Sequence, residues 1–193
     1  YSHYEYTKNE EFLKINLHMC ENAVEFLKRY VKDLIEQTGK YAISYDIWEE
    51  SDRGIHMYSL ASIYSAFDSM KKIYKALGKK VSDFENNRLK EEKIQKNINE
   101  MAELQLKVKE LIEEKLYDDN RKSYVRNSED RRIDISLLGA VYPFNVFSAK
   151  EKKILNTIEN INLTIRTYTG GYQRYEHDGY RGGAPWPISN LWM

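Results

Sequence analysis

The stretch YSLASIYSAFDSMKKIYKALG, residues 58–78, decides the fold class of this chain. Its apolar side chains recur every three or four residues, which is the spacing of one face of an α-helix. Ser59 is placed to cap the start of this helix, and Gly78 to end it in a left-handed conformation. The opposite face carries small residues, so the helix can be buried on more than one side. These small residues are Ala61, Ser62, Ser65, Ala66 and Ser69.

Charged amphipathic helices are predicted on both sides of this stretch. Residues 10–38 carry an apolar residue at every third or fourth position, and Gly39 follows as a stop signal. Residues 82–116 open with a capping box formed by Ser82 and Glu85 and continue with apolar residues at near-heptad spacing. That seam suits either the outer helix of a globular domain or one strand of a coiled coil.

The second half of the chain predicts shorter helices. An apolar segment at residues 133–141 indicates one helix, and residues 148–165, which open with the capping-box pattern SAKE, indicate another. Pro187 stands where the first turn of a final helix could begin. Because no strand pattern of comparable length competes, the sequence predicts an all-α fold built from helical hairpins.

Three unusual loops lead into the apolar helix of each predicted hairpin. They read YDIWEESDRGIHMYS at 45–59, YVRNSEDRRIDIS at 124–136 and TGGYQRYEHDGYRGGAPWP at 169–187. Consecutive helices of such hairpins run antiparallel, so these loops should all lie at the same end of the assembly. We therefore expect one surface to gather the three loops.

The overall composition narrows the choice of partners. Lys and Arg together number 30, as do Asp and Glu, so the chain has no formal net charge at pH 7. Nucleic acid and anionic membrane surfaces are therefore not expected partners, and an uncharged substrate is favoured. A single cysteine and the lack of an apolar run long enough to cross a bilayer favour a soluble, cytoplasmic protein.

Aromatic residues concentrate in the same loops. The tryptophans Trp48, Trp186 and Trp192 lie in or beside them, together with several tyrosines. Flat apolar rings beside hydrogen-bonding groups suit a sugar, which presents C–H patches on its faces and hydroxyls at its edge. The same rings could equally close the end of a helical bundle.

Paired carboxylates in the first loop suggest hydrolytic chemistry. Cleavage of a glycosidic bond needs one protonated carboxyl to donate to the leaving oxygen and one carboxylate to activate water or attack carbon. Glu49 and Glu50 are candidates for the first role, because adjacent like charges and the neighbouring Trp48 raise a carboxyl pKa. A solvated surface position is the plain alternative for such a dipeptide.

Two segments then resemble a known family. YDIWEESDRGIHMYSLASIYSAF at 45–67 and GGYQRYEHDGYRGGAPWPISNLW at 170–192 resemble glycoside hydrolase family 15, which includes glucoamylases, glucodextranases and some trehalases. Between them, IDISLL at 133–138 is similar to the Asp-Ala-Ser-Leu-Leu segment of that family. The resemblance extends over nearly the whole chain.

The resemblance implies a fold and a role for each of the site residues. The fold would be an (α/α)6 toroid barrel, of which residues 1–193 would be about half, without the last part of the barrel and without an N-terminal β-sandwich. Glu49 would be the general acid. The substrate-binding residues implied by the family are Asp46, Trp48, Glu50, Arg174, Tyr175, Tyr180 and Trp186.

The function implied is that of an inverting, exo-acting α-glucosidase that releases glucose from α-glucans or α-glucosides. Trehalase or glucodextranase activity of the same family is an alternative, as is a non-catalytic carbohydrate-binding or helical interaction module. The family's general base comes from a later loop, so this chain alone should be inactive. We expect an oligosaccharide or α-glucoside as substrate, and the remaining half of the barrel or a second copy as partner.

No metal or cofactor is expected. His56 and His177 lie in the loops, but neither has a partner at ligand spacing. The segment DDNRKSY at 118–124 lacks the central glycine and the final glutamate of a calcium loop, so we interpret it as a turn.

Overall fold

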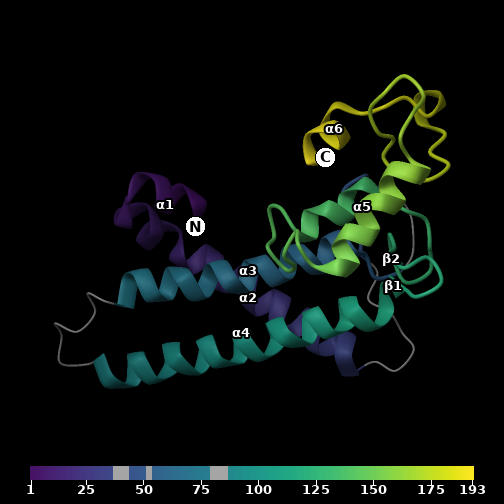
Figure 1. The fold of residues 1–193 in the computed structure, drawn as a ribbon. Coiled ribbons are helices and arrows are strands. Elements are labelled where there is room, and N and C mark those ends of the chain that lie inside the picture. Colours follow the sequence, from purple (N-terminus) through teal and green to yellow (C-terminus); the bar gives the residue numbers. More distant parts are fainter. Residues whose placement is uncertain (37–43, 51–53, 79–86) are drawn as a thin grey trace. The chain divides into compact units, whose positions relative to one another are not determined.

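The computed structural model describes residues 1–36, 44–50, 54–78 and 87–193. Figure 1 traces its elements along the chain.

Helices dominate, so the predicted all-α class is confirmed. Among the described residues, no helix has both the length and the apolar composition needed to span a membrane. In order, the elements are α1 (Ser2–Thr7), α2 (Glu10–Glu36), α3 (Met57–Gly78), α4 (Asn87–Lys115), β1 (Tyr117–Asp118), β2 (Ser123–Tyr124), the 3₁₀ helix η2 (Ile135–Ala140), α5 (Lys152–Thr164), the 3₁₀ turn η3 (Tyr180–Gly182) and α6 (Pro187–Trp192).

The chain divides into two compact units. The first unit comprises residues 1–39 and 63–108, and the second comprises residues 40–62 and 109–193. Because the boundaries fall within long helices, α3 and α4 each contribute residues to both units. The candidate site residues all belong to the second unit.

Long helices packed side by side form the first unit. At its end, α3 places Tyr74 and Gly78 in one groove with Ile94 of α4. Earlier in α3, Lys71 and the carbonyl of Tyr64 hydrogen-bond Gln105, which lies further along α4. The two helices therefore run antiparallel. Helix α2 joins them through Tyr74, whose hydroxyl donates to Glu21 at 2.9 Å.

A buried lysine ties α2 to α4. The ammonium of Lys28 donates to Glu25 at 2.7 Å, to Asn97 at 3.2 Å and to Glu100 at 2.8 Å, so each of its three N–H groups has an acceptor. Burial lowers the pKa of Lys28, but the hydrogen bonds and charges of Glu100 and Glu25 outweigh burial, and the net pKa is raised. Lys28 is thus buried, although it is one of the charged residues between the apolar positions of the predicted helix.

The second unit is built around a small apolar cluster. Its buried members come from the segment around η2 and from α5, and they are Ile133, Ile135, Leu138, Ile161 and Ile165. Trp48, Ile158, Tyr172 and Trp192 pack against this cluster. Helix α5 also contacts strand β2 of the short antiparallel hairpin. Trp192 is thus partly buried against the apolar cluster of this unit.

Several boundaries differ from the sequence predictions. Helix α3 begins at Met57, so Ser59 is not its cap; its hydroxyl instead donates to the carbonyl of Tyr45 at 2.7 Å. Gly78 belongs to α3 and does not have a positive φ, so the predicted left-handed stop is wrong. The stop at Gly39 and the capping box of Ser82 and Glu85 lie outside the described residues.

The shorter predicted helices are partly confirmed. Within residues 133–141 the structure has the short 3₁₀ helix η2, and the carboxylate of Asp134 caps its first turn by accepting from Ser136 N at 2.7 Å. In the SAKE segment, Ser148 N donates to the Glu151 carboxylate at 2.8 Å, but α5 itself starts only at Lys152. Pro187 opens α6 as predicted. The segment DDNRKSY is confirmed as a turn, since it joins β1 to β2.

The apolar seam predicted in residues 82–116 is largely buried within this chain. Met101, Leu104 and Val108 on α4 are all buried. A seam that already packs inside the fold is not available as a coiled-coil surface. The structure therefore favours the outer-helix interpretation of this segment over the interaction module.

Two leucines two positions apart on α4 provide a matched test of this packing. Leu104 is 6% exposed and Leu106 is 63% exposed. We expect Leu104→Ala to lower the free energy of unfolding by about 2–5 kcal/mol, because it removes packed methyl groups and leaves a cavity. Leu106→Ala should change it by less than about 0.5 kcal/mol. Urea unfolding of both variants checks this, and equal losses would contradict the described burial.

Candidate active site

The three predicted loops meet within the second unit. The first and second loops are joined by a backbone bridge between His56 and Asn127, and the Met57 amide donates to the carbonyl of Arg126 at 3.2 Å. A second bridge joins Asp134 to Tyr175, which lies in the third loop. The prediction that the loops converge is therefore confirmed. We call this convergence the three-loop site.

Asp46 organises the turn that carries the candidate acid. Its Oδ1 accepts from the amides of Trp48 at 3.0 Å and Glu50 at 3.4 Å, and its carbonyl accepts from the Glu49 amide at 3.3 Å. Aspartate forms such turns readily, since its short side chain reaches the backbone two residues on. Asp46 thus orients the loop from a buried position.

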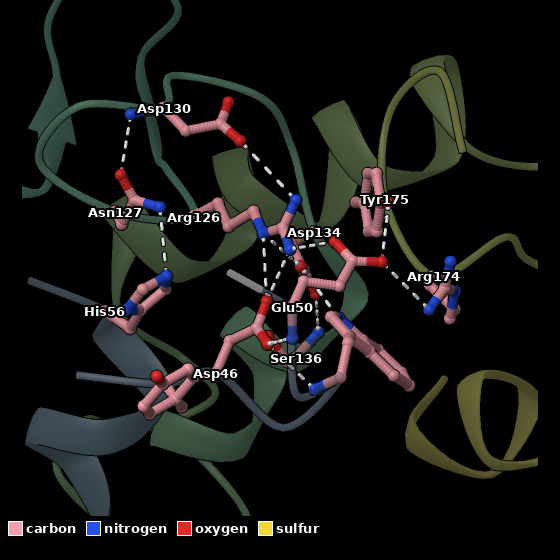
Figure 2. Close-up of polar contacts among 12 residues, drawn as sticks. Asp46, Glu50, His56, Arg126, Asn127, Asp130, Asp134, Ser136, Arg174 and Tyr175 are labelled. Atoms are coloured by element: carbon pink, nitrogen blue, oxygen red, sulfur yellow. Dashed lines mark hydrogen bonds and ion pairs between the residues drawn. The ribbon is translucent and has the colours of Figure 1, made fainter. Parts of the chain in front are cut away.

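Arg126 of the second loop lies at the centre of the three-loop site (Figure 2). Its side chain is 1% exposed, and its Nη2 donates to Glu50 Oε2 at 2.7 Å. Asp46 Oδ2 accepts from both Nη2 and Nε of the same guanidinium. Asp134 lies 3.4 Å from Nε, and the ring centroid of Tyr175 lies 4.0 Å from the guanidinium carbon. This arginine was not among the residues chosen from the sequence.

Glu50 is held by donors from two loops. Its Oε1 accepts from the Tyr175 hydroxyl at 2.8 Å and lies 3.1 Å from a terminal nitrogen of Arg174, while Oε2 accepts from Arg126. Both oxygens of Glu50 are thus occupied by donors of the protein. Glu50 therefore suits binding and organisation rather than proton donation. The pKa of Tyr175 is raised to about 12, first by burial and then by its bond to Glu50.

Trp48 is anchored by a fully buried carboxylate. Its indole N–H donates to Asp134 Oδ2 at 3.0 Å, and its ring packs on the apolar cluster. Burial raises the pKa of Asp134 to about 6, although donors from Ser136, Arg126 and Trp48 act in the opposite direction. The orientation of Trp48 thus depends on a group in the second loop.

Arg174 is surrounded by aromatic rings and fixed by Asp178. Its Nε and Nη2 donate to the two oxygens of Asp178 at 2.8 and 2.7 Å. This pairing and the nearby Glu50 raise the pKa of Arg174, although burial opposes them. Four ring centroids lie 4.9–5.6 Å from its guanidinium carbon, and they belong to Trp48, Tyr175, Tyr180 and Trp186. Flat rings around a hydrogen-bonding group provide the kind of surface that sugars contact.

Glu49 differs from its neighbours in the turn. It has a positive φ of 57°, its side chain is exposed, and within the described residues its carboxylate makes no hydrogen bond or ion pair. The structure therefore brings Asp46, Trp48, Glu50 and the third-loop residues together. It leaves Glu49 at the surface of the same turn.

Glu176 and His56, two other ionisable residues of these loops, have structural partners. Glu176 forms a two-bond pair with Arg121 at 2.7 and 2.9 Å, and it also accepts from the Ile133 amide. His56 is buried and bonds Ser44 and Asn127. His177 is exposed. Among the described residues, no group of three or more His, Cys, Asp or Glu side chains is arranged to hold a metal ion.

The glycine pairs of the third loop form tight bends. Gly170 and Gly171 have φ of 85° and 86°, and Gly182 and Gly183 have φ of 68° and 74°. Residues with a side chain rarely adopt these angles. A side-chain carbon at Gly183 would also lie 2.3 Å from Gln173. These bends return the chain so that Trp186 lies beside Tyr180, with 5.5 Å between ring centroids.

Arg126 and Asp134 are the central residues that sequence reasoning missed. Both lie in the second loop, which the hairpin pattern had marked as unusual. The composition of this loop held a signal for a buried arginine, because its several acidic residues can compensate the charge of an arginine that is buried among them. The pattern did not show which of the loop's three arginines, Arg126, Arg131 or Arg132, is the buried one.

Comparisons with known proteins agree with this picture of the fold. Three solved glycosidase structures, the wild type and two variants, superpose with TM-scores of 0.60 to 0.61 at 15 to 17% identity. They cover 77 to 82% of this chain, whereas this chain covers 35 to 37% of theirs. One of the variants was determined in complex with glucose. The chain thus shares its fold with part of a glycosidase.

A curated relative points to the same class. An uncharacterised glycosyl hydrolase of Methanocaldococcus jannaschii is 26% identical over 195 aligned residues, which include 99% of this chain. The chain spans only about a quarter of that relative's length, 28%. No family model matches the chain. At this level the comparisons give similarity to glycosyl hydrolases, without a particular family.

The buried carboxyl of Asp134 makes stability depend on pH. An aspartate in an unfolded chain has a pKa of about 3.9. The folded-state pKa is higher, so the stability that the protonated form provides is lost as the pH rises through about 6. Asp134→Asn cannot ionise. Its free energy of unfolding relative to the native protein should therefore rise by roughly 1 kcal/mol between pH 5 and pH 7.

Urea unfolding at several pH values measures this difference. Asp130→Asn is the control, because the pKa of Asp130 is lowered: burial raises it, but the bonds and charge of Arg132 outweigh burial. The carboxyl of Asp130 titrates below the tested pH range. The difference in free energy of unfolding between Asp130→Asn and the native protein should therefore stay constant. A constant difference for Asp134→Asn as well would show that Asp134 remains ionised throughout.

Proposed function

We propose that this chain is part of the (α/α)6 barrel of a glycoside hydrolase related to family 15, and that Glu49 is its general acid. The similarity to glycosidases in fold and to a glycosyl hydrolase in sequence supports the class. The motifs around Glu49 and Arg174 support the family. The reaction is hydrolysis of an α-glucosidic bond with inversion, in which glucose is released from a chain end.

One observation carries the assignment of Glu49. Of the three described carboxylates in the 44–50 segment, Asp46 and Glu50 are paired with Arg126, and only Glu49 has no cationic partner. A carboxyl whose oxygens already bond an arginine cannot meet a leaving oxygen until that pairing breaks. Glu49 is therefore the carboxyl in this turn that is free to exchange a proton with a leaving oxygen.

The surroundings of Arg174 support an uncharged sugar as substrate. Trp48, Tyr180 and Trp186 provide ring surfaces around its guanidinium. Glu50 neutralises that guanidinium from one side and Asp178 from the other. A site whose cations are already compensated has little to offer an anionic ligand, so a neutral oligosaccharide or α-glucoside fits best.

The chain by itself should bind sugar without hydrolysing it. An inverting enzyme needs a second carboxylate about 6.5–9.5 Å from the acid, with room for a water. Glu176 and Asp178 do not suit that role, because each is bound to an arginine through two hydrogen bonds. We therefore place the general base in a part of the barrel outside these residues.

Glu49→Gln in the full-length protein tests the acid. For maltose, kcat should fall about 10²- to 10⁴-fold, because protonation of the leaving oxygen is lost. For α-glucosyl fluoride, whose leaving group needs little protonation, kcat should fall less than about tenfold. Maltose binding, followed by tryptophan fluorescence, should remain close to that of the native protein.

The matched control is Glu129→Gln, an exposed glutamate of the second loop, which should leave both rates unchanged. Equal losses for maltose and the fluoride would contradict a role as general acid. Rates on maltose, isomaltose and trehalose then separate glucoamylase, glucodextranase and trehalase activities. Binding without any hydrolysis by the full-length protein would favour the non-catalytic alternative.

The exposed apolar face of α5 predicts how the isolated chain behaves. Leu155 and Leu163 are 53% and 77% exposed and lie on one face of the helix. We propose that the rest of the barrel covers this face, so the isolated chain should self-associate. Replacing both leucines by Gln should raise the monomer fraction in light scattering, whereas Glu159→Gln on the same face should not. A monodisperse native monomer would contradict this expectation.

A further inference from the structure

One guanidinium closes the turn that carries Glu49. Arg126 binds Asp46 at the start of this turn and Glu50 at its end, so a single side chain of the second loop holds both ends (Figure 2). The distances are 3.2 Å from Nε to Asp46 Oδ2 and 2.7 Å from Nη2 to Glu50 Oε2. Arg126 also lies 3.4 Å from Asp134, the carboxylate that anchors Trp48.

Glu49 lies between these anchored residues in an unfavourable backbone conformation. Its φ of 57° places it in the left-handed region, which residues with a side chain enter only when the surrounding structure requires it. Trp48 before it is tied to Asp134, and Glu50 after it is tied to Arg126, Arg174 and Tyr175. With both neighbours directed into the protein, the remaining side chain of the turn points outwards.

We infer that Arg126 is a positioning residue that keeps Glu49 in its left-handed conformation by clamping Asp46 to Glu50. The clamp concerns only the conformation of the turn, whatever reaction the protein catalyses. Its consequence for hydrolysis rests on the proposed function, in which Glu49 donates the proton. A clamp of this kind fixes where the carboxyl can meet a leaving oxygen without contacting the substrate itself.

The chain offers a matched pair of arginines for the test. Arg132 resembles Arg126 in stacking on Tyr175, at 4.7 Å from the ring centroid, and in pairing with Asp130. Of these two arginines, only Arg126 has a described contact with the turn of Glu49. Substitution by Lys preserves the charge that the buried carboxylates need, but a single ammonium cannot reproduce the fork that spans two carboxylates. Arg126→Lys therefore removes the clamp, whereas Arg132→Lys leaves it in place.

A thermal cycle measures the clamp independently of activity. In the native background, Glu49→Gly should melt about 2–4 °C higher than Glu49→Ala, because glycine tolerates a positive φ. The same difference in melting temperature should persist when Arg132→Lys is present in both variants. With Arg126→Lys it should fall by at least half, since the released turn no longer forces position 49 into the left-handed region. An equal advantage in all three backgrounds, or none in the native one, would overturn the inference.

Kinetics of the full-length protein measure the consequence for catalysis. Arg126→Lys should lower kcat on maltose at least about tenfold with KM nearly unchanged, whereas Arg132→Lys should retain the native kcat. If Arg126→Lys keeps the kcat of the native protein, the positioning role is overturned. A native protein that hydrolyses no glucoside would contradict the proposed function instead, and the thermal cycle would still decide the clamp.

Discussion

The three-loop site depends on the compensation of buried charge around Arg126. A cation that is 1% exposed can be accommodated only if carboxylates surround it, and those carboxylates can be buried only if the cation remains. Asp46 and Glu50 come from the first loop, and Asp130 and Asp134 from the second. Removing one member of such a set leaves uncompensated charge, at a cost of about 3–5 kcal/mol. The loops are therefore held together as one electrostatic unit.

The third loop joins this unit through an aromatic ring and a second arginine. Tyr175 stacks on Arg126 and donates to Glu50, and Arg174 reaches Glu50 from the other side. Each group thus has more than one partner, which restricts its position. Networks of this kind become rigid when fully satisfied. A rigid surround suits the sugar site that we propose, because less ordering is needed when a ligand binds.

The same network separates two adjacent glutamates into different environments. Glu50 accepts from two arginines and a tyrosine, whereas Glu49 faces outwards. Two identical side chains in consecutive positions thereby have different surroundings. Assigning acid chemistry to one carboxyl and binding to the other requires this kind of difference. The two residues also differ in backbone conformation, since Glu49 has a positive φ of 57°.

The sequence by itself determined the helical class, the approximate helices and the meeting of the three loops, because these follow from periodicity and antiparallel connection. It also marked Trp48, Glu49, Glu50 and Arg174 through their motifs. It did not determine the burial of Lys28 or Arg126, nor the 3₁₀ form of residues 135–140. Those features were decided by the tertiary structure, because a charged side chain can be buried only where partners distant in sequence, such as Glu100 for Lys28 and Asp46 for Arg126, compensate it.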